Sequence, residues 1–443
     1  MLLTMSTLDI ALAKLLVPTL RGDGLSPTVV ANKSMRVRIT MLIPSLAKKV
    51  YRWLSVLVFS GFLMVVVANG AFYVALLFKE HLKAFVAPSN PVGERYGESL
   101  RDAYPELSFG EINDLLVETW TRSFAYDPVV QFREGSYKGR YVNVADAGFR
   151  HSTSQGPWPP SDSSYNIFVF GSSSTFGYGL PDGQTVPSFL QQQLGEIGGR
   201  PVKIYNFGRG HYYSTQERRL FERLLMDGIV PDGAIFIDGL SEFSHSGNRL
   251  PYSGLLGEAL DSGFLSRLGW MFDAMPLQRL LFWFRKRILR RSGVETKLPI
   301  VVGGRAPTAG EMGPEQVATL SARYLLNAKL IAVLAESYGV DVVFVWQPVS
   351  TYRVEPGAVP LKDVDMGAHA FAGRAYEQSR SRLENHPAGN RFLWCADVQA
   401  GVTEALYVDA VHYNARAASL FAGCISKATL KRNLLTNARR KDR

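Results

Sequence analysis

The sequence predicts a three-layer α/β/α sandwich with a mainly five-stranded parallel sheet, preceded by one transmembrane helix. Two observations predict it: a long uncharged segment near the N-terminus, and strand-length apolar runs that alternate with helical segments after Tyr165. Such alternation is typical of a parallel sheet with helices on both faces. The expected strands are Asn166–Gly171, Val202–Phe207, Ala234–Asp238, Val342–Gln347 and Arg391–Asp397. The expected helices are Thr185–Leu194, Ser214–Met226, Pro314–Tyr338 and Asn414–Ala428.

The uncharged segment reads WLSVLVFSGFLMVVVANGAFYVALLF over residues 53–78. A membrane-spanning helix needs about 20 apolar residues, so this segment is long enough to cross a bilayer. Basic residues crowd its N-terminal side, which by the positive-inside rule keeps residues 1–52 in the cytoplasm. We therefore expect a single-pass anchor in the inner (cytoplasmic) membrane, with everything after Phe78 on the periplasmic or extracytoplasmic side. The flanking basic residues are Arg36, Arg38, Lys48, Lys49 and Arg52.

The exported part divides into two expected regions. Residues 79–162 form a juxtamembrane segment, for which packing on the main domain and spacing it from the bilayer both stay open. Within it, residues 109–123 have helical spacing of apolar side chains. Residues 163–443 form the main domain, with an insertion at about 246–310. The insertion contains Leu277–Arg291, LQRLLFWFRKRILRR, either a helix lying on anionic lipid or a cap packed on the domain.

Composition excludes several classes of protein. Hydrophobic residues make up 47% of the chain and charged residues 20%, which indicates a large folded core rather than disorder. The net charge of +10 raises nucleic acid as a partner, but no zinc-finger spacing or RNP-like string accompanies the basic clusters, so we expect none. Two cysteines, Cys395 and Cys424, exclude a multi-cysteine metal site. We expect them to be buried free thiols, with pairing outside the cytoplasm as the alternative.

Chemistry-bearing side chains gather where the expected strands end. In a parallel α/β sheet the active site lies beyond the carboxyl ends of the strands. Three strands run into polar, glycine-containing turns there, and a fourth such segment precedes the last helix. The four segments are GSSSTFGYG (171–179), NFGRG (206–210), DGLSE (238–242) and YVDAVHYN (407–414).

In this order, the four segments resemble the motif blocks of the SGNH/GDSL hydrolase superfamily, over about residues 163–428. The resemblance implies a flavodoxin-like sandwich in which Ser173 is the nucleophile, His412 is its general base and Asp409 is the carboxylate that orients the histidine. It also implies an oxyanion site made by the backbone amides of Ser173 and Gly208, with the Ser241 hydroxyl as a third donor. The upstream GRYVNVADAGFR (139–150) looks like a lead-in found in membrane-anchored relatives.

The sequence departs from the family pattern at two positions. Ser172 stands where an aspartate usually precedes the nucleophile, and small residues look common there in the membrane-anchored branch. Ser241 stands where the third block has an asparagine. A hydroxyl also donates a hydrogen bond but has a shorter reach, and loss of one oxyanion donor lowers rates by about a hundredfold or more. Glu242, His245 and the Gln347–Pro348 pair lie near these blocks, either lining the pocket or serving the structure.

The residues fit acyl transfer through an ester on serine. A serine hydroxyl needs a base, histidine has a suitable pKa, and a carboxylate fixes its tautomer. We expect a membrane-anchored serine esterase acting on an acylated cell-envelope carbohydrate or lipid, such as an O-acetylated polysaccharide, without cofactor or metal. Two alternatives stay open: an O-acyltransferase using the same triad, and a catalytically degenerate glycan-binding or assembly protein. The oligomeric state is left open.

Overall fold

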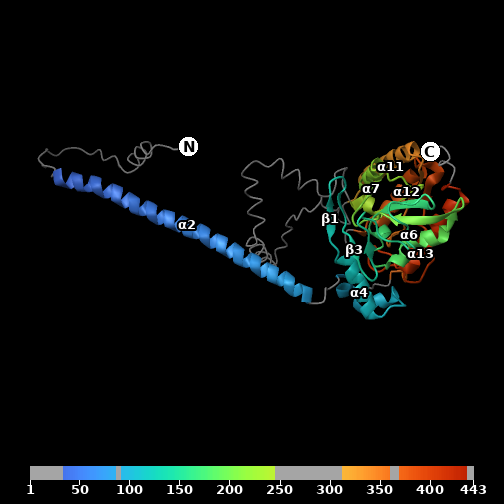
Figure 1. Ribbon diagram of the computed structural model, residues 1–443, viewed down its shortest axis with the longest axis horizontal. Coiled ribbons are helices and arrows are strands. Elements are labelled where there is room, and N and C mark those ends of the chain that lie inside the picture. The colour runs from blue at the N-terminus through green and yellow to red at the C-terminus, as the bar shows by residue number, and fades with distance from the viewer. Residues whose placement is uncertain (1–32, 86–90, 245–311, 360–368, 437–443) are drawn as a thin grey trace. The chain divides into compact units, whose positions relative to one another are not determined.

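The computed structural model describes residues 33–85, 91–244, 312–359 and 369–436 (Figure 1). The chain divides into two compact units, Met1–Leu76 and Leu77–Arg443. The expected insertion at 246–310, with its basic segment and His245, lies outside the described residues.

The first unit is dominated by helix α2, Lys33–Phe85. Its stretch Ala47–Leu76 has a mean hydropathy of 2.1, and none of it is buried. Large apolar side chains such as Trp53 and Phe62 are about two-thirds exposed or more, at 75% and 66%. The helix predicted over residues 53–78 is therefore confirmed, and its length and apolar surface suit a membrane anchor.

The second unit is built on a six-stranded sheet with the order β10-β9-β8-β5-β7-β6. The five expected strands are present and all pair in parallel. A sixth strand, β6, adds an antiparallel edge beside β7; it has only two residues, too few to leave a sequence pattern. The strands are β5 Tyr165–Gly171, β6 Glu196–Ile197, β7 Arg200–Asn206, β8 Gly233–Asp238, β9 Asp341–Trp346 and β10 Phe392–Trp394.

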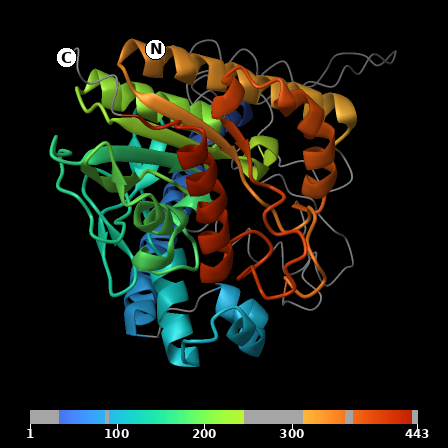
Figure 2. The ribbon, with the colours of Figure 1, turned by 90° about the vertical axis from the view of Figure 1, so that its right-hand side faces the viewer.

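Helices cover both faces of this sheet (Figure 2). Helices α6, Val186–Leu194, and α13, Ala415–Lys431, share an aliphatic core with Ile167 of β5. Helices α7, Ser214–Met226, and α11, Pro314–Ser337, share an aromatic core with Phe168 on the opposite face. Successive side chains of a strand point to opposite faces, so the buried run YNIFVFG of β5 supplies both cores. The expected α/β/α sandwich is confirmed.

The sequence did not predict helix α12, Ala372–Glu384, of this unit. Helix α12 packs against α11 and against the short helix η3, Leu240–Ser244. Its sequence, AGRAYEQSRSRLE, is mostly polar, and its few buried side chains include Ala375, Tyr376 and Leu383. A helix of this kind is stabilised by its packing and leaves a weak apolar period.

The segment before the sheet packs against the main domain. It contains α3 Pro91–Tyr96, η1 Gly97–Asp102, α4 Phe109–Trp120, the hairpin β1 Phe124–Asp127 with β2 Gln131–Glu134, and the short pair β3 Tyr137–Lys138 with β4 Asn143–Val144. Helix α4 begins at a capping box in which Ser108 and Glu111 bond reciprocally. Its buried Leu115 and Leu116 share one core with Val408, from the last motif block.

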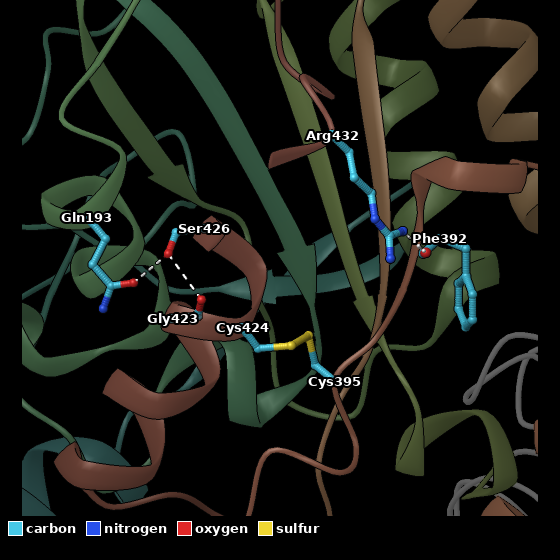
Figure 3. Close-up of a disulfide and its surroundings, with 7 residues drawn as sticks. All are labelled: Gln193, Phe392, Cys395, Gly423, Cys424, Ser426 and Arg432. Atoms are coloured by element: carbon cyan, nitrogen blue, oxygen red, sulfur yellow. Dashed lines mark hydrogen bonds between the residues drawn. A yellow bond between two sulfur atoms is a disulfide. The ribbon is translucent and has the colours of Figure 1, made fainter. Parts of the chain in front are cut away.

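The prediction of free thiols was wrong, because Cys395 and Cys424 form a disulfide (Figure 3). Cys395 follows β10, and Cys424 lies on α13, which packs beside it. Their Cα atoms are 6.0 Å apart, within the range that a disulfide bridges. The two positions are 29 residues apart in sequence, so their proximity depends on the docking of α13 on the sheet.

Candidate active site

The nucleophile candidate lies at a tight turn between a strand and a helix. Strand β5 ends at Gly171, and α5, Ser173–Phe176, begins two residues later. A Cβ atom on Gly171 would lie 2.8 Å from the carbonyl oxygen of Ile237 in β8, so only glycine fits the close approach. Ser173 is partly exposed at the first position of α5, while the side chains after it are buried. The turn thus presents one hydroxyl at the carboxyl edge of the sheet.

The structure brings Ser173, His412 and Asp409 together. His412 Nε2 lies 2.9 Å from Ser173 Oγ, and His412 Nδ1 lies 2.7 Å from Asp409 Oδ2. The imidazole side chain is 14% exposed and the Asp409 side chain 12%, so both are shielded while one edge stays open. A hydroxyl, an imidazole and a carboxylate in this order make up a nucleophile, its base and the group that orients the base.

Asp409 is held in place by its own chain. Its Oδ1 accepts hydrogen bonds from the backbone N–H groups of Val411 and His412, both at 2.7 Å. Burial by itself would raise the pKa of Asp409, but the charge and hydrogen bonds of His412, with the Val411 amide, bring that pKa below its ordinary value. The carboxylate is therefore ionised at neutral pH and fixes His412 Nδ1 as the protonated ring nitrogen.

Arg150, the last residue of the lead-in segment, secures the turn that follows Ser173. Its guanidinium is fully buried and donates to the carbonyl oxygens of Phe176 at 3.0 Å and Gly177 at 2.7 Å. It also pairs with Asp182 at 2.9 Å. Burial lowers the pKa of Arg150, and the Asp182 carboxylate opposes this shift. The lead-in segment therefore stabilises the turn that carries Ser173.

The predicted oxyanion residues occupy the same sheet edge. A Cβ on Gly208 would lie 2.7 Å from the Thr175 carbonyl carbon, which explains the glycine. The Gly208 N–H donates to Asn206 Oδ1 at 3.0 Å, so an oxyanion would share or displace this acceptor. Ser241 is partly buried in η3, directly after β8. The Ser173 N–H begins α5 and has no acceptor within that helix. The oxyanion roles of these three residues stay predictions.

Buried acids surround the third block. Glu242, for which pocket and structural roles were open, has a structural one: its Oε1 accepts from the Ser214 amide at 2.6 Å, and its Oε2 pairs with Arg323 at 3.3 Å. Glu217 and Asp238 are buried next to it. Burial, and then the neighbouring carboxyls, raise the pKa of both well above the ordinary range. Protonation of one of these carboxyls would relieve the repulsion between them.

Sequence reasoning missed several side chains around His412. The Trp120 ring meets the imidazole edge-on at a centroid distance of 5.6 Å, and the Tyr178 ring stacks on it at 5.4 Å. Trp120 belongs to the apolar period of residues 109–123, so its pattern indicated only helix packing. Loss of solvation lowers the pKa of His211 and of His369, and nearby His412 lowers both further. His211 directly follows the second motif block, 206–210, which is the signal that could have found it, whereas His369 has no motif block beside it.

Comparison with known proteins gives fold-level similarity only. No protein-family model and no curated protein matches the chain. Among solved structures, a lipolytic protein of the G-D-S-L family from Desulfitobacterium hafniense is 12% identical, with a TM-score of 0.32, covering 60% of this chain and 99% of that one. The esterase EstA from Pseudoalteromonas sp. is 12% identical, with a TM-score of 0.32, at 61% and 99% coverage. Axe2, an acetylxylan esterase from Geobacillus stearothermophilus, is 10% identical, with a TM-score of 0.31, at 60% and 93%. At these identities and TM-scores, the likeness carries no conclusion about activity.

Proposed function

We propose that this protein is a membrane-anchored serine enzyme of the SGNH/GDSL type that cleaves or transfers acyl esters. The observation that carries the proposal is the continuous chain from Ser173 Oγ through His412 to Asp409, at 2.9 Å and 2.7 Å. Both distances lie within hydrogen-bond reach, which is what a nucleophile and its general base require.

The proposed reaction has two halves. Ser173 Oγ attacks the carbonyl carbon of the ester while His412 Nε2 takes the hydroxyl proton, and the departing alcohol leaves with that proton. An acceptor hydroxyl then attacks the acyl-serine, gives its proton to His412, and the released Ser173 oxygen takes it back. Asp409 stabilises the imidazolium that forms in both halves. Water as acceptor makes the protein an esterase, and a sugar hydroxyl makes it an O-acyltransferase.

The proposed location is the outer side of the cytoplasmic membrane, and the proposed substrate is an acylated envelope carbohydrate or lipid. The basic flank before residue 53 and the uncharged α2 support this orientation. The Cys395–Cys424 disulfide supports it independently, because disulfides persist in oxidising compartments such as the periplasm. When a reporter enzyme is fused after Arg443, its activity should be found only outside the cytoplasm. Reporter activity in the cytoplasm would show that the orientation is the opposite one.

The test of the chemistry uses the full chain purified in detergent. A fluorophosphonate probe should label one residue, mapped by mass spectrometry to Ser173, and short-chain nitrophenyl esters should be hydrolysed. Ser173→Ala should abolish labelling and lower turnover by more than about a thousandfold, with His412→Ala nearly as severe.

The same experiment separates the competing functions. Release of free acid in water, or acyl transfer to an added oligosaccharide, distinguishes the esterase from the O-acyltransferase. A folded wild-type chain that no acyl or phosphonate probe labels, and that binds glycans equally well as Ser173→Ala, would favour the degenerate binding protein. Labelling at another residue would reject the site.

A further inference from the structure

Two aromatic rings contact the His412 imidazole in addition to its bonds with Asp409 and Ser173. Tyr178 stacks on the imidazole with an angle of 23° between the ring planes, and Trp120 stands edge-on to it at 85°. The two aromatic rings also contact each other, at 5.4 Å between centroids. Tyr178 comes from the turn after the nucleophile, whereas Trp120 is the last residue of α4. The base is therefore contacted by two elements that are 58 residues apart in sequence.

Tyr178 is itself held through its phenol. Its hydroxyl donates to Glu134 Oε1 at 3.4 Å, and the Gly210 amide of the second block reaches the same oxygen at 3.4 Å. The other Glu134 oxygen pairs with Arg122 Nη2 at 3.2 Å. Burial and then the Glu134 charge raise the pKa of Tyr178, so the phenol remains a neutral donor. One carboxylate thus joins the hairpin, the second block and the ring on His412.

The Arg122–Glu134 pair is almost sealed from solvent. The Arg122 side chain is 2% exposed and the Glu134 side chain 1%. Arg122 also donates to the carbonyl oxygens of Glu118 at 2.7 Å and Thr119 at 2.9 Å, which end α4 beside Trp120. A buried ion pair contributes little net stability compared with apolar residues, so its specific value lies in fixing geometry. Here it fixes the positions of both aromatic neighbours of His412 at once.

We infer that Tyr178 is a positioning residue for His412, and that the buried Arg122–Glu134 pair of the upstream segment sets its position. The inference rests on the proposed function, because it takes His412 as the general base and adds a positioning residue for it outside the four matched positions of the motif blocks. Asp409 fixes one ring nitrogen of His412 but leaves the ring free to tilt about that bond. The stacked phenol restricts this tilt and keeps Nε2 aimed at Ser173 Oγ. A small misalignment of a catalytic group lowers rates strongly, so the effect falls on the chemical step.

The first measurement separates kcat from KM in the detergent-purified full chain. Tyr178→Leu removes the stacked ring and should lower kcat about tenfold or more, with KM within about twofold of wild type. Tyr178→Phe keeps the ring but loses the bond to Glu134, and should lower kcat about threefold.

The matched control is Tyr165, whose phenol likewise donates to a buried carboxylate, Asp341, at 3.2 Å. Tyr165 lies at the amino end of β5, opposite the end that carries Ser173. Tyr165→Phe and Tyr165→Leu should leave kcat within about twofold, since they touch none of the three triad residues. Equal losses in the Tyr165 and Tyr178 series would overturn the inference, because the effect would then reflect general destabilisation.

The second measurement does not depend on turnover. The chain has seven histidines, so ¹⁵N-histidine labelling gives a simple spectrum in which the Nδ1 proton bonded to Asp409 appears far downfield. The inference expects this resonance in wild type and in Tyr165→Leu, and a broadened or shifted one in Tyr178→Leu. If the leucine variant does not fold, Tyr178→Phe against wild type decides the same question, since a smaller displacement is expected there.

The outcomes separate the two proposals. A wild-type chain without labelling or turnover rejects the proposed function, while the resonance still reports whether Tyr178 orients the imidazole. A wild type that turns over, with kcat and the resonance both unchanged in the Tyr178 variants, rejects the positioning role and leaves the triad intact.

Discussion

Two aspartates lie at the same edge of the sheet, and their surroundings shift their pKa values in opposite directions. Asp409, 9% exposed, accepts three hydrogen bonds from Val411 and His412. Asp238, 4% exposed, ends β8 next to Glu217 and Glu242, and its Oδ2 meets no amide or guanidinium donor among the described residues. The pKa of Asp409 is lowered, whereas burial raises that of Asp238.

The difference shows that burial alone does not decide the charge of an acid. Burial penalises the charged form in both cases, and only local donors overcome that penalty. The Asp-x-x-His spacing places two backbone amides and an imidazole around Asp409, because the chain turns back on itself before α13. Asp238 faces carboxyls from α7 and η3 instead, so protonation is the favourable response. The donors around Asp409 favour its charged form, whereas the carboxyls around Asp238 favour its neutral form.

Of the changes that test this comparison of the two acidic sites, Asp409→Asn should have the largest effect. Asp409→Asn removes the charge that stabilises the imidazolium, and should lower kcat for nitrophenyl ester hydrolysis by about a hundredfold or more. Glu217→Gln, the matched change in the protonated cluster, should leave kcat within about threefold, because an amide resembles the neutral acid. Similar losses in both variants would erase the functional distinction between the two sites.

A buried base extends the comparison. Burial lowers the pKa of His386 to about 3, and its Nε2 has no hydrogen-bond partner within the described part of the chain. The unfolded chain takes up a proton near pH 6.5 while the folded chain does not, so stability falls as the pH drops from about 6.5 toward 3. This amounts to about 2 kcal/mol between pH 6.5 and pH 5. In denaturant titrations, His386→Phe should weaken this loss of stability at acid pH. If the loss is as large in the variant as in wild type, it comes from other titratable groups.

The buried carboxyls should give folding stability the opposite dependence on pH. The folded-state pKa of Glu217 lies above its unfolded value, so the folded chain keeps a proton that the unfolded chain releases as pH rises above about 4.3. Stability from this group therefore falls with rising pH, by about 1.4 kcal/mol for each pH unit between the unfolded-state and the folded-state pKa. Glu217→Gln should be relatively more stable than wild type at pH 8 than at pH 5. Denaturant midpoints that differ equally at both pH values would show that Glu217 is ionised.

The smallest expected effect concerns the third block. Ser241→Asn restores the side chain usual in the resembled family and should keep or raise esterase kcat, while Ser241→Ala should lower it by a few-fold. Neither substitution should change the pH dependence of unfolding, which we expect to arise from His386 and from the Glu217–Asp238 cluster. If neither alters kcat, Ser241 does not face the oxyanion.

The sequence predicted α2, the five parallel strands and four of the helices around them, because long apolar periods reflect burial directly. It also predicted that Ser173 lies at the carboxyl edge of the sheet, since that follows from topology. The resemblance to the family blocks implied that Asp409 and His412 lie there too. Sequence reasoning missed α12, whose polar sequence is stabilised by its neighbours. It also treated residues 79–162 only as a packing or spacing segment, although Trp120 from that region contacts the proposed base, His412, and Glu134 bonds the Tyr178 ring stacked on it.

The sequence by itself determined the fold class, because hydrophobic periodicity is a local property of the chain. The resemblance of its four segments to the SGNH/GDSL blocks implied the identity and order of the proposed triad. Only the tertiary structure decided which distant side chains meet. It brought α13 beside β10, so that Cys395 and Cys424 form a disulfide. It also formed the ion pair between Glu134 and Arg122 and placed Glu217 next to Asp238. Charge, proton and disulfide states depend on neighbours in space, and no spacing along the chain records those neighbours.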